Sequence, residues 1–153
     1  MDLNEFSFGI EDFSSILEEL YPLWREHHNE LVGKETPLQP DLERYIQLQR
    51  NQRLVIFTIR DKYQRLCGYS FFVLSNHLHR TQVIKADNDL FFIREYYRRG
   101  WLASKFIQFC EKKLFSTKVN QIYMRTKTKQ SFGVLLERSG YKQEEVLYIK
   151  KKE

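Results

Sequence analysis

The sequence predicts a mixed α/β fold, with two N-terminal helices on one side of a mostly antiparallel sheet. Apolar residues recur with helical spacing before position 50, and a series of β-branched and aromatic runs follows it. A strand, a basic turn and a helix then occupy residues 83–115. Because 153 residues, 42% of them hydrophobic, suffice for one core, we expect a single domain over residues 1–153.

The N-terminal third is expected to hold the two helices. Apolar residues recur at three- and four-residue intervals from Phe13 to Trp24, which predicts a first helix that Pro22 kinks or restarts. Gly33 and two prolines mark a loop after it. Asp41 can cap a second helix, with an apolar face that includes residues 42, 45 and 46.

Three apolar runs predict the antiparallel part of the sheet. Residues 54–60 and 65–74 are rich in β-branched and aromatic side chains, and the polar residues between them predict a hairpin. Residues 83–93 form a third run, expected to pair back on the second. A loop that holds two histidines separates these last two strands.

The C-terminal half predicts further alternation of helix and strand. Residues 103–115 place apolar side chains on one helical face, residues 121–125 read as a short strand, and residues 131–138 as a helix ended by Gly140. Residues 141–150 are expected to form a closing strand. The first of these helices lets the strands on either side of it lie parallel.

Composition limits the partners and the location. Lys and Arg number 25 against 20 Asp and Glu, and this balance favours anionic partners without choosing among nucleic acid, a phosphorylated cofactor and an acidic protein. The sequence has no long apolar run and no signal-like N-terminus, so we expect no membrane partner and a cytoplasmic location. Cys67 and Cys110 lie in apolar surroundings and are expected to be reduced core residues.

The segment 89–111, DLFFIREYYRRGWLASKFIQFCE, carries the main functional signal. It reads as a strand, a tight turn with Arg98 and Arg99, and an amphipathic helix. Backbone N–H groups at the start of a helix form a ready site for an anion. The segment therefore predicts that a phosphate-bearing ligand binds at residues 98–104. The alternative interpretation is that these residues are only the basic N-terminus of a helix that binds no ligand.

The turn also carries a family pattern. Arg98 and Ala103 match the first and last positions of Q/RxxGxG/A, and the residues that follow are in step with the helix that usually comes next. Trp101 stands at the central glycine position, with Gly100 one residue earlier. By this pattern and by the order of its elements, the chain resembles the GCN5-related N-acetyltransferases over nearly its whole length.

Further matches point to a subset of that family. The variant RRGxLA, led by EYY, is similar to the turn of small acetyltransferases from bacteriophages and bacteria. Members of that set carry an HLH segment before the cofactor strand, as residues 76–79 do here, and a closing pattern matched by Gly140, Tyr141, Glu145 and Tyr148. For a phage-encoded protein, the expected location is the host cytoplasm.

The resemblance implies acetyl-CoA as co-substrate and no metal. It implies that backbone N–H groups of the turn hold the pyrophosphate, that the preceding strand binds the pantetheine arm, and that a backbone N–H near Ile93 polarises the acetyl carbonyl. The implied cofactor-binding residues are Phe91, Ile93, Arg98, Arg99, Gly100, Trp101, Leu102, Ala103 and Ser104.

Acetyl transfer to an amine needs a base, because a protonated ammonium has no lone pair. Asp87 and Asp89 lie two apart, so we expect them to share one face of the cofactor strand with Phe91 and Ile93. In family members that use a carboxylate, it lies on this strand several residues before the turn, which suits Asp87 especially. A solvated strand start is the alternative interpretation of the two aspartates.

Histidines and tyrosines supply the other catalytic candidates. His79, which forms HxH with His77, could act as a base or line the acceptor pocket, whereas a metal would need further ligands. His27 and His28 lie on a polar stretch of helix and are expected at the surface.

Many family members use a tyrosine as the acid that protonates the leaving thiolate. The matching position here is Leu136, and Tyr148 is a substitute, together with Tyr123 and Tyr141. Each of these three is at least as well explained as a core or interface aromatic.

Two functions from different classes follow. The first is an acetyl-CoA-dependent N-acetyltransferase that uses direct attack by a primary amine in a ternary complex. Its acceptor would be a polyamine, an aminoglycoside-like compound, a protein amine or an aminoacyl group on RNA, and a homodimer is one expected state because family members often dimerise. The second is a catalytically impaired binding module of the same fold, contacting nucleic acid or a host protein.

Overall fold

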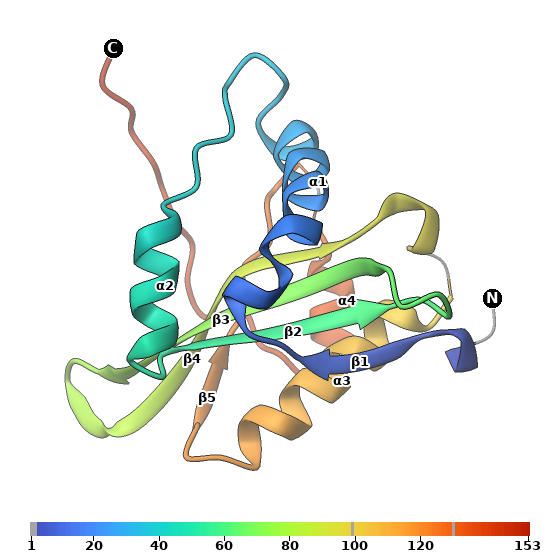
Figure 1. The fold of residues 1–153 in the computed structure, drawn as a ribbon. Helices are drawn as coiled ribbons and strands as arrows, with labels where there is room; N and C mark the ends of the chain where they lie inside the picture. The colour runs from blue at the N-terminus through green and yellow to red at the C-terminus, as the bar shows by residue number, and fades with distance from the viewer. Residues whose placement is uncertain (1–2, 99, 130) are drawn as a thin grey trace.

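A computed structural model describes residues 3–98, 100–129 and 131–153 (Figure 1). Short 3₁₀ turns cover Leu3–Glu5 and Glu95–Tyr97. The helices and strands, in chain order, are β1 (Ser7–Ile10), α1 (Phe13–Leu31), α2 (Leu42–Arg50), β2 (Leu54–Arg60), β3 (Leu66–His77), β4 (Arg80–Ile93), α3 (Leu102–Phe115), β5 (Gln121–Tyr123) and α4 (Gly133–Arg138).

The five strands form one sheet in the order β1-β2-β3-β4-β5. The first four pair as antiparallel neighbours, whereas β5 lies parallel to β4. A parallel pair needs a crossover, and α3 supplies it between β4 and β5. The predicted mixed and mostly antiparallel sheet is therefore confirmed.

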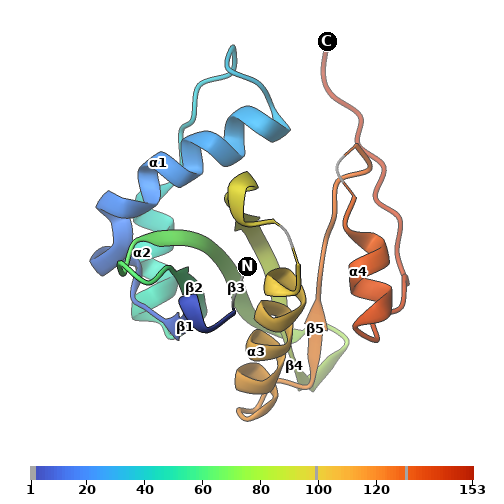
Figure 2. The same cartoon turned by 90° about the vertical axis from the view of Figure 1, so that its right-hand side faces the viewer.

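Helices cover both faces of the sheet, as Figure 2 shows. The apolar side of α1 packs with α2 on one face. On the other face, α3 packs on alternate residues of the same strands, because successive side chains of a strand point to opposite sides. The buried core under α1 and α2 comprises Phe13, Ile16, Leu20, Leu23, Trp24, Leu54, Ile56, Leu66, Tyr69, Phe71 and Phe92.

The two N-terminal helices follow from local sequence signals. α1 runs through Pro22 without restarting, because the apolar residues on both sides of it pack on the sheet. Asp41 caps α2 as predicted, since its Oδ1 accepts a hydrogen bond from the backbone N–H of Arg44 at 3.1 Å. Neither of these helices, nor any other in the described part of the chain, is long and apolar enough to cross a membrane.

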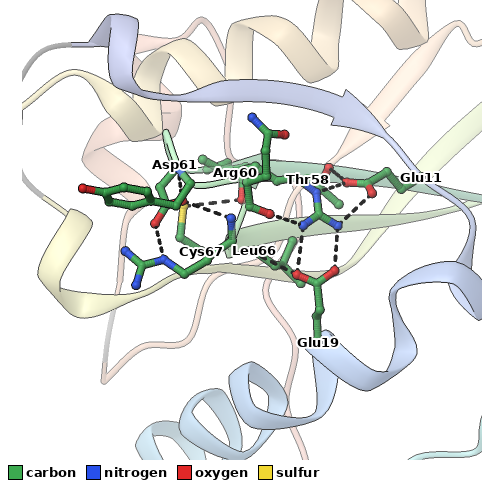
Figure 3. Close-up of polar contacts among 11 residues, drawn as sticks. Glu11, Glu19, Thr58, Arg60, Asp61, Leu66 and Cys67 are labelled. Atoms are coloured by element: carbon green, nitrogen blue, oxygen red, sulfur yellow. Dashed lines mark hydrogen bonds and ion pairs between the residues drawn. The ribbon is translucent and has the colours of Figure 1, made fainter.

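Ion pairs connect the residues at the start of α1 with the β2–β3 hairpin (Figure 3). The Arg60 guanidinium lies 2.9 Å from Glu11 and 2.9 Å from Glu19, and these bonds lower the pKa of both carboxyls. Asp61 closes the turn by accepting from the backbone and the Nε of Arg65, at 3.0 and 2.8 Å. The entry of α1 therefore has a fixed position on the sheet.

Two sequence predictions about the sheet edges need correction. No strand forms over residues 141–150, which run as an irregular segment, because no edge of the sheet pairs with them. β1, which pairs residues 7–10 with 57–60, was not predicted. A strand of four residues is too short to show a clear alternation of polar and apolar side chains.

Candidate active site

The turn before α3 has backbone N–H groups that find no partner among the described residues. The first intrahelical hydrogen bond joins the Lys105 N–H to the Trp101 carbonyl at 2.9 Å, and no side chain caps the helix. The N–H groups of residues 102–104 therefore have no partner within the helix. Together with the positive end of the helix dipole, they form a site suited to an anion.

Gly100 takes the backbone conformation that the turn requires. Its φ is +72°, in the left-handed region that favours glycine, and a Cβ placed there would meet open space. Trp101, at the central glycine position of the pattern, has φ −96° and a side chain that is 72% exposed. The departure at Trp101 is therefore accommodated, because the glycine that the turn needs stands one residue earlier.

Arg98 points back into the protein. Its Nε donates to the Ile93 carbonyl at 2.6 Å, its Nη2 donates to Glu30 of α1 at 2.8 Å, and its guanidinium lies 5.2 Å from the Phe92 ring centroid. The contacts of Arg98 therefore fix the shape of the turn. Arg99, which the sequence analysis also assigned to the cofactor, lies outside the described residues.

β4 and β5 separate beside this turn. The parallel pairing covers only residues 85–87 of β4, so β5 does not pair with residues 88–93. The N–H of Arg94 bonds the Cys67 carbonyl of β3, and backbone groups of successive strand residues point to opposite edges. The backbone groups of Phe91 and Ile93 therefore face the open edge, on the side of the turn.

A β-bulge interrupts β4 at Asp89. Phe71 of β3 pairs with Leu90, whereas the next residue, Phe72, pairs with Asn88. Asp89 is therefore the extra residue of the bulge, and the alternation of side chains shifts by one at this point. Such an insertion bends the strand and redirects the side chains near it.

The bulge overturns the predicted common face of the aspartates and the cofactor residues. Ala86 before the bulge, and Phe91 and Ile93 after it, all belong to the core under α3. Asp87 is adjacent to Ala86 and therefore faces α1 and α2. Asp89 faces the same way, toward a side chain of α2. The two aspartates thus lie opposite the cofactor residues, across the sheet.

Each aspartate has one main partner, and neither partner was predicted from the sequence. Arg125, two residues after β5, binds both carboxylate oxygens of Asp87, one of them at 3.1 Å. The Tyr45 hydroxyl of α2 donates a hydrogen bond to Asp89. Burial raises the pKa of Tyr45 most, and this hydrogen bond raises it further. These pairings depend on strand register and helix position, neither of which the sequence displays.

Two predicted catalytic residues lie away from this cluster. His79 is in the β3–β4 turn, beyond Arg80, and Asp87 lies seven steps of about 3.3 Å each along the strand from Arg80. His77 is adjacent, yet the described residues hold no cluster of three His, Cys, Asp or Glu side chains suited to a metal. Tyr148 is 90% exposed in the irregular C-terminal segment. The structure therefore joins neither residue to the aspartates.

His27 is buried, contrary to the expectation of a surface residue. Its ring stacks on Phe92 with centroids 4.8 Å apart, and its Nδ1 lies 2.9 Å from the Tyr69 hydroxyl. Burial, with the Arg98 charge, lowers the pKa of His27 to about 4. The polar residues around His27 indicated a solvent-exposed stretch, although position 27 continues the apolar stripe of α1.

Glu111 of α3 lies under the separation of β4 and β5. Its Oε1 is buried and has no hydrogen-bond partner among the described residues. Burial raises the pKa of this carboxyl, and the Tyr141 hydroxyl lowers it in part. Phe132, at the start of α4, stacks on Phe91 with centroids 5.3 Å apart. This side of the sheet is therefore closed by α3, α4 and the residues that flank α4.

No family model matches the sequence, and no curated protein matches it. Solved structures match the fold. One is an aminoglycoside acetyltransferase from an uncultured soil metagenomic sample, with a TM-score of 0.76, 9% identity and 99% of both chains covered. A ribosomal-protein-alanine N-acetyltransferase from Brucella melitensis biovar Abortus 2308 matches with a TM-score of 0.72 and 14% identity, over 95% of this chain and 99% of the other.

A plant enzyme is a further solved structure that matches the fold. Glucosamine-6-phosphate N-acetyltransferase from Arabidopsis thaliana has a TM-score of 0.70 and 12% identity, over 96% of this chain and 99% of that chain. These TM-scores establish a common architecture, and at such low identities the likeness is one of fold alone. With its five-stranded sheet, the separation of β4 and β5 and the turn before α3, this chain has the fold of the GCN5-related N-acetyltransferases.

Proposed function

We propose that this protein transfers an acetyl group from acetyl-CoA to a primary amine, by direct attack within a ternary complex. The observation that carries the proposal is the uncapped start of α3 beside the open edge of β4. The first feature suits a pyrophosphate, and the second suits an extended chain of amides. The neighbours of the same fold are acetyltransferases by description.

The backbone donors and the open space at the turn support binding of acetyl-CoA. The N–H groups of residues 102–104 would hold the pyrophosphate, and the space beside Gly100 leaves room for it. The backbone of Phe91 and Ile93 would bind the pantetheine arm as an added strand. When bound, acetyl-CoA supplies a thioester carbonyl and a thiolate leaving group.

Asp89 is the better placed of the two predicted bases. Asp87 has both oxygens bound by Arg125, and a carboxylate held by a guanidinium is a poor proton acceptor. Asp89 is exposed, and its carboxylate accepts a hydrogen bond from a neutral hydroxyl, that of Tyr45. In the proposed reaction Asp89 takes the proton from the ammonium, directly or through water, while Asp87 and Arg125 hold the end of β5 against β4.

The acceptor class is a primary amine. The three neighbours are described by three different acceptors: an aminoglycoside, the alanine of a ribosomal protein and glucosamine 6-phosphate. One fold therefore serves small and macromolecular amines, and the acceptor must be identified by experiment.

Calorimetric titration with acetyl-CoA tests the cofactor site. Gly100→Ala adds a side chain at φ +72°, and Gly33→Ala adds one at φ +102° in the α1–α2 loop, where space is equally open. Both variants carry left-handed strain, so both should lose stability by about 1 kcal/mol. Only Gly100→Ala should weaken binding of acetyl-CoA. The proposal fails if the wild-type protein does not bind acetyl-CoA at millimolar concentration.

A further inference from the structure

The Tyr45 ring of α2 is packed among three buried aromatic side chains. It stacks on Phe13 with centroids 5.2 Å apart, and its centroid lies 5.6 Å from that of Trp24 and 5.7 Å from that of Phe71. Close packing on several sides confines a side chain to one rotamer. The ring is therefore held in one orientation, and its hydroxyl reaches beyond the core.

Hydrogen bonds fix α2 at both of its ends. Asp41 caps the helix through the Arg44 N–H at 3.1 Å, and its carbonyl accepts from the Tyr45 N–H at 3.2 Å. Near the other end, the Gln49 side chain accepts from the Phe13 N–H, at the start of α1, at 2.9 Å. The cap holds the turn that carries Tyr45, and Gln49 holds the helix against α1.

The bulge in β4 brings the Asp89 carboxylate to this hydroxyl. Asp89 is the extra residue of the bulge and has no residue of β3 directly opposite it. An exposed aspartate at such a position can occupy several rotamers unless a contact selects one. The hydrogen bond from Tyr45 to Oδ2 supplies that contact, and Oδ1 accepts no hydrogen bond from the described residues.

The Tyr45 hydroxyl donates without neutralising the carboxylate. Burial raises the pKa of Tyr45 most, and the bond to Asp89 raises it further, so the phenol keeps its proton. A neutral donor leaves the negative charge on Asp89, whereas a guanidinium would compensate it.

Arg125 is the competing partner for Asp89. It binds both oxygens of Asp87, and its charge also interacts with that of Asp89. Its Nη1 lies 3.5 Å from the carbonyl of Asn88, the residue before Asp89. Without the bond from Tyr45, the Asp89 carboxylate would be drawn toward this guanidinium.

We propose that Tyr45 is a positioning residue, whose hydroxyl holds the Asp89 carboxylate away from Arg125 and leaves one oxygen open to the acceptor amine. This inference rests on the proposed function, in which Asp89 takes a proton from the ammonium. A base must lie within hydrogen-bond reach of the proton that it removes, so a carboxylate turned toward Arg125 no longer serves the reaction. In this role Tyr45 acts only through Asp89.

A crystal structure of Tyr45→Phe tests the positioning whether or not the protein transfers acetyl groups. Phenylalanine keeps the ring among its aromatic neighbours and removes only the hydroxyl. Compared with wild-type crystals of the same form, the Asp89 carboxylate should turn to within about 3.2 Å of an Arg125 nitrogen. An Asp89 side chain that keeps its wild-type position would overturn the proposal.

Kinetics measure the consequence for the reaction. Thiol release is followed with spermidine, kanamycin and a peptide with an N-terminal alanine, and the most active of these amines is used for the variants. Tyr45→Phe should lower kcat about tenfold, as expected for the loss of one hydrogen bond, and leave KM within about twofold. Tyr69→Phe is the matched control, because it removes a buried hydroxyl that pairs with His27, and its kcat should stay within about twofold of the wild type.

A double-mutant cycle separates action through Asp89 from a general structural effect. Tyr45→Phe with Asp89→Asn should have the kcat of Asp89→Asn alone, to within about twofold. Losses that multiply in the double variant, or a kcat of Tyr45→Phe equal to that of the wild type, would overturn this inference and leave the proposed function standing. A wild-type protein that neither binds acetyl-CoA nor releases thiol would overturn both together. Circular dichroism checks that the variants are folded.

Discussion

Arg98, in the turn before α3, donates to the carboxylate of Glu30 on α1, and the distance between the two groups is 2.8 Å. A second pair, Arg94 with Glu26 one turn earlier on α1, repeats this arrangement at 2.8 Å, four residues before Arg98. α1 lies on the face of the sheet that holds Asp87 and Asp89. The helix on the side of the two aspartates therefore also fixes the turn proposed to hold the cofactor.

Removal of the Arg98 side chain should weaken cofactor binding without unfolding the protein. Arg98→Ala loses the bonds to Glu30 and to the Ile93 carbonyl, so the turn is no longer held in shape. The dissociation constant for acetyl-CoA should rise about tenfold, whereas a partly exposed ion pair contributes at most about 1 kcal/mol to stability. Arg25→Ala, on an exposed position of α1, is the control. Equal affinities for the two variants would contradict this role of Arg98.

Asp89 should control the pH dependence of the reaction. Asp89→Asn removes the proposed base and should lower kcat about a hundredfold at neutral pH, with a smaller loss at alkaline pH, where the amine is already neutral. Asp87→Asn breaks the bond to Arg125 and should lower the rate by a similar factor at every pH. Rate profiles between pH 6 and 10 separate the two. The assignment is wrong if the profile of Asp89→Asn runs parallel to that of the wild type.

His27 should make the protein sensitive to acid. Its pKa is lowered to about 4 in the folded state, so between pH 6.5 and 4 the unfolded chain binds a proton that the folded chain does not. The free energy of unfolding should therefore fall as pH decreases through this window, by up to about 3 kcal/mol. Urea unfolding at several pH values measures the slope.

Substitution of His27 should flatten that slope. His27→Gln removes the titrating group, and His79→Gln, whose side chain stays in water in the folded protein, serves as the control. The same slope in wild type and His27→Gln would show that another group is responsible.

Glu111 should destabilise the protein at high pH. Burial raises the pKa of this carboxyl, so the folded state binds its proton more tightly than the unfolded state. Stability should therefore fall as pH rises above the ordinary pKa of a glutamate. Glu111→Gln should raise the Tm at pH 8, with a difference that disappears by pH 4, whereas Glu137→Gln on the exposed side of α4 should change little. A lower Tm for Glu111→Gln at pH 8 would contradict this account.

Long periodic segments were predicted well because many residues carry the same signal. β2, β3, β4 and α3 begin and end within a few residues of their predicted bounds. β1 has only four residues, and the segment 141–150 has the composition of a strand without a partner in its own chain. Whether such a segment becomes a strand depends on an available edge, which the sequence does not display.

The site was predictable only in part, for a similar reason. The turn could be found because Gly100 and the helix that follows are local features. The bulge at Asp89 adds a single residue and leaves no local mark, yet it decides which face each carboxylate occupies. Arg125 and Tyr45 reach the aspartates through strand register and helix packing, and both are properties of the folded chain.

The most direct test of the central claim is a measurement of coenzyme A thiol release from acetyl-CoA, with a panel of polyamines, aminoglycosides and peptide amines. We predict release that requires an amine, that Gly100→Ala reduces and that Asp89→Asn nearly abolishes at neutral pH. Binding of acetyl-CoA without release for any amine would instead favour a catalytically impaired binding module. Absence of both binding and release would contradict the account.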